Sequence, residues 1–344
     1  MKQTSILLLV LLATAASGGQ ASGQALGSEN TLATLYPVQV DGKYGYIDKT
    51  GKLVIKPQFD DAWSFEEGLA GVRTGDGESR KWGVIDREGK YVINPRFPGL
   101  VVFSEGLAAF DIGGRWGYVD RTGKIAINPQ FDEARNFSQG RASVLVDGKW
   151  GFIDKTGDIV ISPQFRNYSS FSEGLALVKT GDYWTGKWGF IGRTGKFVVK
   201  TQFDGAREFT PDGLAAVMIG GKYGYIDKTG QYAVVPQFDG ANDFSEGLAA
   251  VETDGKFGYI NRTGSYTINP QFVAADCFSE GLAAVKSGGK YGYIDKTGKF
   301  VIDPQFDNAY DFHDGLAGVR IGHPDTGKLG YIDRTGRFVW KVGD

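Results

Sequence analysis

The 344-residue sequence has little of the residue types that usually carry catalysis or bind metals. It contains 1 cysteine and 2 histidines, which excludes an intramolecular disulfide framework and every metal site built from several cysteines. Lysine and arginine number 38 against 40 aspartates and glutamates, a formal charge of −2. Without a basic excess the chain has no general attraction for phosphate backbones, so we expect no nucleic-acid partner. We also expect no cofactor.

Glycine and aromatic residues are abundant by contrast. The chain has 52 glycines, 23 phenylalanines, 16 tyrosines and 7 tryptophans, and 41% of its residues are hydrophobic. That share is enough to bury a core, and many turns joined by aromatic-rich strands are typical of all-β proteins. No segment has a helical period of useful length. The composition therefore predicts an all-β fold.

The N-terminus has the features of an export signal. A positive start over residues 1–4 precedes an apolar run over 6–12, then the small residues Ala13-Thr14-Ala15. The run is too short to span a bilayer core, which needs about 20 residues, and no cysteine follows it for lipid attachment. We expect a signal peptide over 1–18, a flexible leader over 19–34 and a repeat domain over 35–344. An uncleaved N-terminal anchor is the alternative.

Cleavage of this signal predicts a chain that is periplasmic, on the cell surface or secreted. No transmembrane segment is expected after cleavage.

An aromatic residue followed by glycine recurs along the chain with a period of 34 residues. Three copies carry four extra residues, always in the same turn, after Val72, Val178 and Val319. Insertions confined to one place indicate an exposed turn in a unit whose length is otherwise fixed by packing. The nine copies begin at Tyr44, Trp82, Trp116, Trp150, Trp188, Tyr223, Phe257, Tyr291 and Leu329, of which the last has lost the aromatic side chain.

One unit contains three predicted strands, at residues 282–285, 290–294 and 299–302 in one copy. The second turn reads D-[KR]-T-G, in which aspartate bonds the turn backbone and glycine supplies a positive φ. Proline cannot donate to a ladder, so we expect the P-Q-F linker to leave the sheet at Pro304. Two phenylalanines six residues apart, such as Phe306 and Phe312, should then pin the linker to the neighbouring unit.

The runs G-K-W-G-[FY]-I-D-K-T-G-K, P-Q-F-D and F-S-E-G-L-A together resemble the WG (or KWG) repeat family of bacterial proteins. The resemblance covers about residues 35–343, with tyrosine or phenylalanine in place of tryptophan in four copies. Such repeats are β-rich interaction modules without a known shared enzymatic activity. The resemblance therefore implies a repeat scaffold rather than a reaction.

The unit count bears on whether the array is open or closed. The chain holds nine complete three-strand units, whereas closed propellers usually have 4–8 blades and often swap a terminal strand. Pro37 in the first strand and Lys341 in the last would protect two free edges. We therefore favour an open superhelical array, a solenoid of β-meanders with an elongated shape. A closed β-propeller is the alternative.

Two sets of carboxylates recur once per unit. The D-[KR]-T-G aspartates each stand alone, unlike the converging oxygens of a calcium loop, and Gly192 and Asn261 replace two of them. We interpret them as turn caps and expect no metal site. The S-E-G glutamates lack the differentiated partner that a glycosidase acid and base require, and Gln139 replaces one. We interpret them as solvated turn residues.

No catalytic constellation emerges from the remaining residues. Cys277 is a lone thiol, either reactive or an incidental substitution, and we favour the second reading. Neither His313 nor His323 is placed beside a nucleophile. We therefore expect no catalytic residues and no enzymatic activity.

Most aromatic residues recur with the period, which assigns them to the core. Tyr183 and Trp184 are exceptions, because they lie in a four-residue insertion where a core role is hard to arrange. Trp63 and Tyr310, which share one linker position, and His323, in another insertion, are further candidates for partner binding. Exposed aromatic faces bind protein partners and also stack on sugar rings.

The first functional hypothesis is a secreted, non-enzymatic repeat scaffold that mediates protein–protein binding. The second is a module that binds carbohydrate or cell-envelope polysaccharide. A hydrolase is the third and least favoured.

Overall fold

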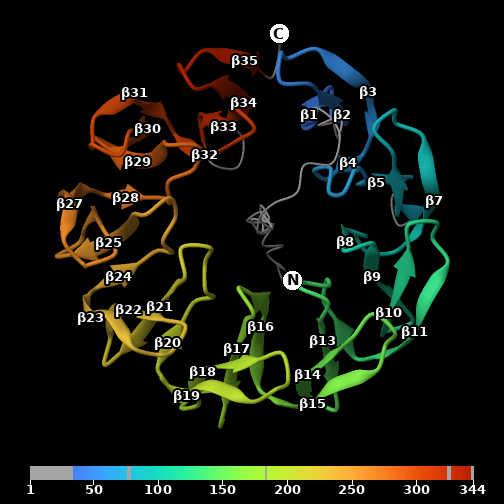
Figure 1. The fold of residues 1–344 in the computed structure, drawn as a ribbon. Helices are drawn as coiled ribbons and strands as arrows, with labels where there is room; N and C mark the ends of the chain where they lie inside the picture. The colour runs from blue at the N-terminus through green and yellow to red at the C-terminus, as the bar shows by residue number, and fades with distance from the viewer. Residues whose placement is uncertain (1–33, 76–78, 183, 324–326, 342–344) are drawn as a thin grey trace, which may run out of the picture. The chain divides into compact units, whose positions relative to one another are not determined.

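Nine antiparallel sheets follow one another around a closed ring, each a blade of a β-propeller (Figure 1). The computed structural model describes residues 34–75, 79–182, 184–323 and 327–341, and this part of the chain contains 35 strands. They belong to one compact unit, Thr31–Asp344. The predicted signal peptide and nearly all of the predicted leader lie outside the described residues. Within the described part, no helix is long and apolar enough to cross a membrane.

In every blade, strands that follow one another in the sequence are also hydrogen-bonded to one another. Blade 1 has three strands: β1 (Tyr36–Val40), β2 (Lys43–Ile47) and β3 (Leu53–Phe59). Blades 2 to 5 have four each: β4 (Asp61–Ala62), β5 (Ala70–Thr74), β6 (Lys81–Ile85), β7 (Tyr91–Phe97); β8 (Phe103–Ser104), β9 (Leu107–Ile112), β10 (Arg115–Asp120), β11 (Ile125–Phe131); β12 (Glu133–Ala134), β13 (Ala142–Val146), β14 (Lys149–Ile153), β15 (Ile159–Phe165); β16 (Asn167–Ser172), β17 (Leu175–Thr180), β18 (Lys187–Gly192), β19 (Phe197–Phe203).

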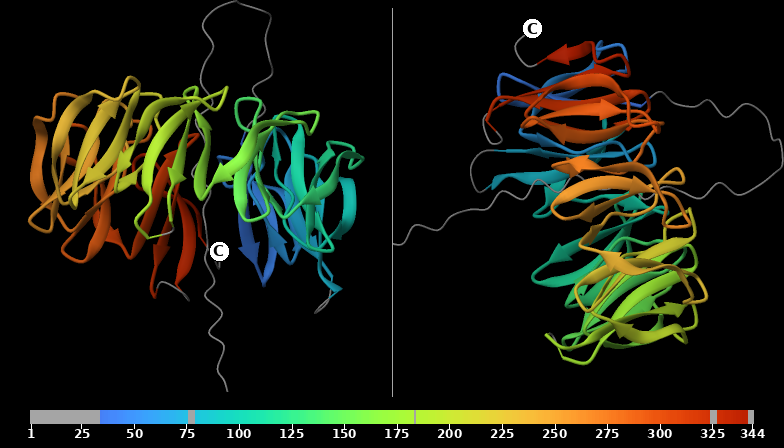
Figure 2. Two further views of the ribbon diagram at one scale, coloured as in Figure 1. Left: turned by 90° about the horizontal axis from the view of Figure 1, so that it is seen from below. Right: turned by 90° about the vertical axis from the view of Figure 1, so that its left-hand side faces the viewer.

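Blades 6 to 9 repeat this arrangement: β20 (Gly205–Ala206), β21 (Leu214–Ile219), β22 (Lys222–Asp227), β23 (Tyr232–Phe238); β24 (Gly240–Ala241), β25 (Ala249–Thr253), β26 (Lys256–Ile260), β27 (Tyr266–Phe272); β28 (Ala274–Ala275), β29 (Ala283–Ser287), β30 (Lys290–Ile294), β31 (Phe300–Phe306); β32 (Asn308–His313), β33 (Leu316–Ile321), β34 (Lys328–Asp333), β35 (Phe338–Lys341). Figure 2 shows the blades from the side, as a stack of sheets bent into the ring.

The extra strand of blades 2 to 9 comes from the linker. Ala62 of β4, for example, pairs with Val72 of β5. These short strands lie nearest the axis of the ring, and the third strand of each repeat lies outermost (Figure 1). A blade is therefore one linker strand followed by one three-strand repeat.

Pro304 lies within β31 rather than beyond its end, so the expectation that the linker leaves the sheet there is wrong. Tyr291 pairs with Phe306 and Tyr293 with Ile302, so a step of two residues in β30 matches a step of four in β31. This β-bulge accommodates the proline, which has no N–H to donate.

The bulge explains why glycine follows the aromatic residue. A Cβ added to Gly292 would lie 2.5 Å from the Ile302 carbonyl oxygen and 2.7 Å from the Pro304 nitrogen. A similar close approach of backbone recurs at Gly45, Gly83, Gly117, Gly151, Gly189, Gly224 and Gly258. The glycine is thus fixed by backbone contact, whereas the aromatic residue before it is free to vary among Trp, Tyr and Phe.

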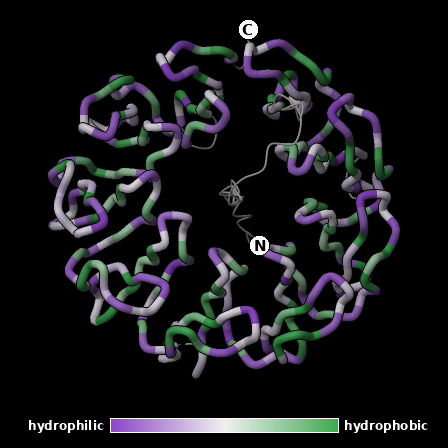
Figure 3. The backbone as a smooth tube through the Cα atoms, in the orientation of Figure 1, coloured by the Kyte–Doolittle hydropathy of each residue, from purple (hydrophilic) through white to green (hydrophobic). Residues whose placement is uncertain are grey.

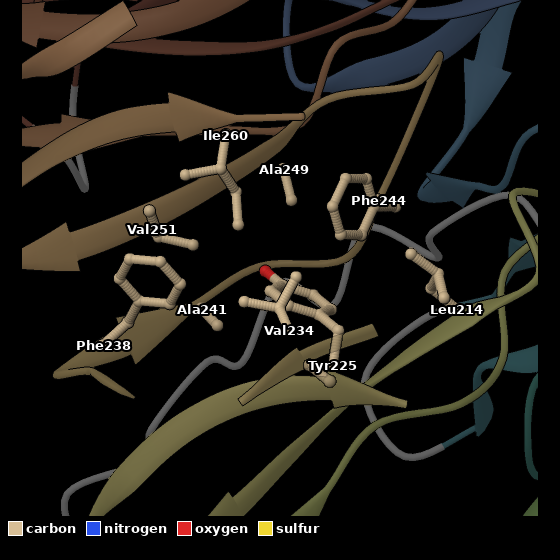
Figure 4. Packing of buried hydrophobic residues seen from close by; sticks show 10 residues of the cluster. Leu214, Tyr225, Val234, Phe238, Ala241, Phe244, Ala249, Val251 and Ile260 are labelled. Carbon is tan, nitrogen blue, oxygen red and sulfur yellow. The ribbon is translucent and has the colours of Figure 1, made fainter. Parts of the chain in front are cut away.

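The hydrophobic core lies between neighbouring blades. In Figure 4, Tyr225 and Val234 of blade 6 face Phe244 and Val251 of blade 7. The rings of Tyr225 and Phe244 have centroids 4.7 Å apart. Figure 3 shows hydrophobic stretches in every blade, and the first strand of a repeat buries consecutive residues, such as 249–251 in β25, so both of its faces are covered. The assignment of the periodic aromatic residues to the core is confirmed for nearly all of the linker phenylalanines and of the aromatic residues that directly follow the glycine, whereas most of the aromatic residues that precede the glycine are half-buried.

Blade 9 packs against blade 1 and closes the ring. Tyr36 and Ile47 of blade 1 share a buried cluster with Leu316 of blade 9. The turn of blade 1 lies so close to β35 that a Cβ added to Gly51 would stand 2.4 Å from the Val339 carbonyl oxygen. The open, elongated array is therefore wrong, and the alternative, a closed propeller, is the fold.

Closure without a swapped strand is possible because successive blades meet through side chains rather than through a shared ladder. Pro37 and Lys341 accordingly do not mark the ends of an open stack. Pro37 lies in the inner strand of blade 1 and Lys341 in the outer strand of blade 9.

Candidate functional site

The turns that carry the insertions lie on the face of the ring where each linker leaves the outermost strand of one blade and crosses to the next. Asp132, which follows P-Q-F, accepts a hydrogen bond from the Asp147 N–H in the turn between β13 and β14 (2.9 Å) and pairs with Arg115 of the preceding blade (2.7 Å). We call such a residue a latch aspartate and this face the latch face. Latch pairs form at five junctions: Lys43–Asp60, Arg115–Asp132, Lys187–Asp204, Lys222–Asp239 and Lys290–Asp307.

The opposite face carries the S-E-G and D-[KR]-T-G turns. Glu105 accepts a hydrogen bond from the Gly140 N–H of the next blade (3.0 Å) and pairs with Lys155 of that blade (3.1 Å). Glu67, Glu173, Glu246 and Glu280 also reach into the following blade. The interpretation of these glutamates as solvated turn residues is therefore wrong, because they clamp one blade to the next.

The D-[KR]-T-G aspartates are turn caps, as the sequence predicts. Asp295 accepts hydrogen bonds from the Thr297 N–H (2.8 Å), the Thr297 hydroxyl (2.5 Å) and the Lys299 N–H (3.2 Å). The bond from the Thr297 side chain is the main cause that lowers the pKa of Asp295. The described part of the chain has no group of three or more His, Cys, Asp or Glu side chains placed to hold a metal ion.

Trp184 is the most exposed large hydrophobic side chain in the described residues, at 86%. In its turn, Asp182 Oδ1 accepts hydrogen bonds from the N–H groups of Trp184 (2.9 Å) and Thr185 (2.7 Å). These bonds, with one from the Thr185 hydroxyl as the largest cause, lower the pKa of Asp182. The capped turn presents the indole on the latch face. Tyr183, the other member of the predicted pair, lies outside the described residues.

An open hollow of about 280 Å³ adjoins Trp184 and is also lined by Arg166, Asn167 and Lys179. Arg166 occupies the position that holds the latch aspartate at five other junctions. Lys149, 17 residues earlier, occupies the position of the lysine or arginine that pairs with that aspartate. The Lys179 ammonium lies 5.8 Å from the centre of the Trp188 ring. The sequence analysis did not predict these lining residues. An arginine at a position where most repeats have aspartate could have indicated Arg166.

The other predicted binding residues are not gathered with Trp184 of blade 5. Trp63 is half-buried in blade 2, and its carbonyl accepts a hydrogen bond from the Tyr46 hydroxyl (2.7 Å). Tyr310 belongs to β32 of blade 9, where its ring packs over Gly318. His323 is exposed in the third inserted turn, on the latch face of blade 9.

Cys277 lies beside the inner strand of blade 8, with its thiol 3.5 Å from the Asp243 carbonyl. Burial, reinforced by the charges of Asp243 and Asp311, raises the pKa of this thiol to about 12. A thiol with such a pKa is protonated at neutral pH and is a poor nucleophile. Burial also raises the pKa of four carboxyls on the inner side of blades 6 to 9, namely Glu208, Asp243, Asp276 and Asp311.

A family model described as the WG containing repeat matches eight segments of the chain: residues 44–77, 82–116, 116–150, 150–184, 188–223, 223–257, 257–291 and 291–322. The chain belongs to the WG repeat family. The ninth copy, which begins at Leu329, lies beyond the matched segments but forms the outer strands of a full blade. No curated protein matches the sequence.

Among solved structures, the crystal structure of a eukaryotic initiation factor is similar over 92% of this chain and 98% of that chain, with 11% identity and a TM-score of 0.65. Hsv2 of Kluyveromyces lactis aligns over 68% of this chain and 92% of that chain, with 10% identity and a TM-score of 0.41. At such low identity the first likeness shows a shared fold only.

Proposed function

We propose that this WG repeat protein is an exported, non-enzymatic scaffold whose latch face binds a protein partner through the turn that holds Trp184. The observation that carries the proposal is the 86% exposure of Trp184 beside an open hollow. Tryptophan is among the residues most enriched at interface hot spots. The export-signal features of residues 1–18 support a partner outside the cytoplasm.

The described residues of this turn are held by hydrogen bonds to one another and to the neighbouring strand. The turn is capped by Asp182, and at its base the hydroxyls of Thr180 and Thr201 are hydrogen-bonded (3.2 Å). Thr201 takes the position that proline holds in most other repeats. Hydrogen bonds of this kind reduce the conformational entropy that is lost on binding, and loops on rigid scaffolds are where binding residues accumulate.

Binding of a carbohydrate or envelope polysaccharide is the second candidate function, and the same observation favours it. An exposed indole face stacks on a sugar ring as readily as on a protein side chain.

The test is capture from envelope and medium extracts by immobilised protein carrying residues 19–344. We expect a protein that is retained by the wild type and lost with Trp184→Ala, but retained by Ile112→Ala. Ile112 is a matched control because it is 61% exposed and borders the corresponding turn of blade 3, which has no insertion. Equal retention by Trp184→Ala would contradict the proposal. Release by free sugar would favour the carbohydrate reading.

A further inference from the structure

The hollow beside Trp184 has a positively charged residue at a position where the other junctions have a negative or a neutral one. The residue after the linker phenylalanine is the latch aspartate at five of eight junctions, and Pro98 and Val273 are neutral exceptions. Arg166 alone reverses the charge. Its backbone N–H still donates to the Lys179 carbonyl (3.0 Å), as the Asp60 N–H donates to the Arg73 carbonyl (2.8 Å). The fold of the junction is therefore kept, and only the side chain differs.

The inserted turn does not itself require this reversal. The other two insertions lie at junctions that keep the latch aspartate. At the third insertion, Asp307 accepts a hydrogen bond from the Gly322 N–H (2.7 Å), and at the first, Asp60 pairs with Lys43 (2.6 Å). Arg166 thus has no explanation in the architecture of the turn, and a ligand offers one.

The carboxylates near the hollow in the sequence are already engaged. Both oxygens of Asp182 accept hydrogen bonds from its own turn, and Asp204 pairs with Lys187. The Arg166 side chain lines the hollow together with Trp184, and Lys179, which also lines it, interacts with the charge of Asp182. A guanidinium beside an aromatic ring is complementary to a carboxylate flanked by an apolar group.

On this basis, which rests on the proposed function, we infer that the hollow binds an acidic segment of the partner protein. A carboxylate of that segment forms a bidentate pair with the Arg166 guanidinium, and a neighbouring apolar side chain packs on the Trp184 indole. A volume of about 280 Å³ suits one or two side chains rather than a chain of sugar rings. A long glycan that bound by stacking on this face would use further exposed rings beside Trp184. The other exposed aromatic residues in the described chain lie instead on outermost strands: Tyr91, Phe197, Tyr232 and Tyr266.

The experiment uses fluorescence anisotropy with a labelled peptide of alternating glutamate and leucine, its lysine counterpart, and polygalacturonate as an anionic polysaccharide. We expect the glutamate peptide to bind, and to bind about tenfold more weakly or worse to Arg166→Asp and to Trp184→Ala. Binding should weaken as salt rises. Arg166→Asp restores a latch aspartate opposite Lys149, so its melting temperature should be unchanged or higher, which separates lost binding from lost folding.

Lys256→Asp is the matched control. Lys256 is exposed, holds the position of Lys149 in blade 7, and faces a junction whose latch position is Val273. The substitution makes the same change of charge away from the hollow, and peptide affinity should not change.

Several outcomes would overturn the inference. These are equal binding of the lysine peptide, no effect of Arg166→Asp, or no binding of either peptide. Arg166-dependent binding of polygalacturonate but not of the peptide would assign the hollow to an anionic glycan instead. If Arg166→Asp retains the partner captured from extracts and Trp184→Ala does not, the proposed function stands and the acidic-segment inference fails.

Discussion

The rings of Tyr36 and Tyr331 lie with centroids 5.4 Å apart and join the last blade of the propeller to the first. In other blades the residue at the position of Tyr331 packs against the second linker phenylalanine of the next blade, as Tyr293 does against Phe312 (4.9 Å). Within the described residues no linker strand precedes β1 in its sheet, and Tyr36 supplies the corresponding ring from β1 itself. The Tyr331 hydroxyl donates to the Pro37 carbonyl (3.2 Å) and so completes the contact.

Truncation of Tyr36 should therefore open the ring at this junction. Tyr36 is buried, so Tyr36→Ala should lower the free energy of unfolding by about 3–5 kcal/mol, as for other large aromatic truncations in cores. Tyr36→Phe keeps the ring but loses the hydroxyl bonds to the carbonyls of His313 (3.0 Å) and Asp314 (3.1 Å), and should cost about 1 kcal/mol. Denaturant unfolding measures both variants. Equal losses would mean that the ring of Tyr36 does not close the propeller.

This closure shows where sequence reasoning stopped. The repeat, the turn caps and the phenylalanine pins were predictable because each recurs at a fixed spacing. Tyr36 occurs once, and its contact with Tyr331 joins opposite ends of the repeat domain, so no period indicates it. The linker strands escaped notice because a strand of two residues, such as Asp61–Ala62, is too short to show alternation. At the candidate site, Trp184 was predictable from its insertion, whereas the hollow beside it depends on which side chains the fold brings together.

The glycine after each aromatic residue should not tolerate a side chain. A Cβ at Gly151 would lie 2.6 Å from the Ile161 carbonyl oxygen and 2.7 Å from the Pro163 nitrogen, and backbone atoms cannot move aside cheaply. We expect Gly151→Ala to destabilise the protein by about 1–3 kcal/mol or more. Gly99→Ala is the control, because an added Cβ there meets nothing within 4 Å. Thermal melts showing equal loss in both variants would contradict the close approach.

Stability should depend on pH through the inner carboxyls. Burial, and then the charge of Asp276, raises the pKa of Asp311 to about 6. The folded chain therefore binds this proton more tightly than the unfolded chain does, and the carboxyl costs stability as the pH rises from about 4 to about 6. Asp311→Asn should raise the melting temperature at about pH 7 and leave it unchanged at about pH 4.

The turn aspartates should act in the opposite direction. Hydrogen bonds lower the pKa of Asp295, so its contribution is present above its ordinary pKa and is lost as the pH falls below it. Asp295→Asn should therefore lower the melting temperature at neutral pH but much less in acid. Melts of the Asp311 and Asp295 variants across the acid range check both signs, and parallel pH profiles would contradict the assignment.

Two tryptophans of the same chain should respond to truncation in opposite ways. Trp150 is 9% exposed, with its ring 4.2 Å from that of Tyr168 and the Arg135 guanidinium 5.5 Å from its centre. Trp150→Ala should cost about 3–5 kcal/mol. Trp184→Ala removes a side chain that is 86% exposed and should change stability by no more than about 0.5 kcal/mol. Denaturant unfolding compares the two variants directly. If Trp184→Ala proved the less stable, the indole would be packed in the folded chain, and its assignment as the binding residue would be wrong.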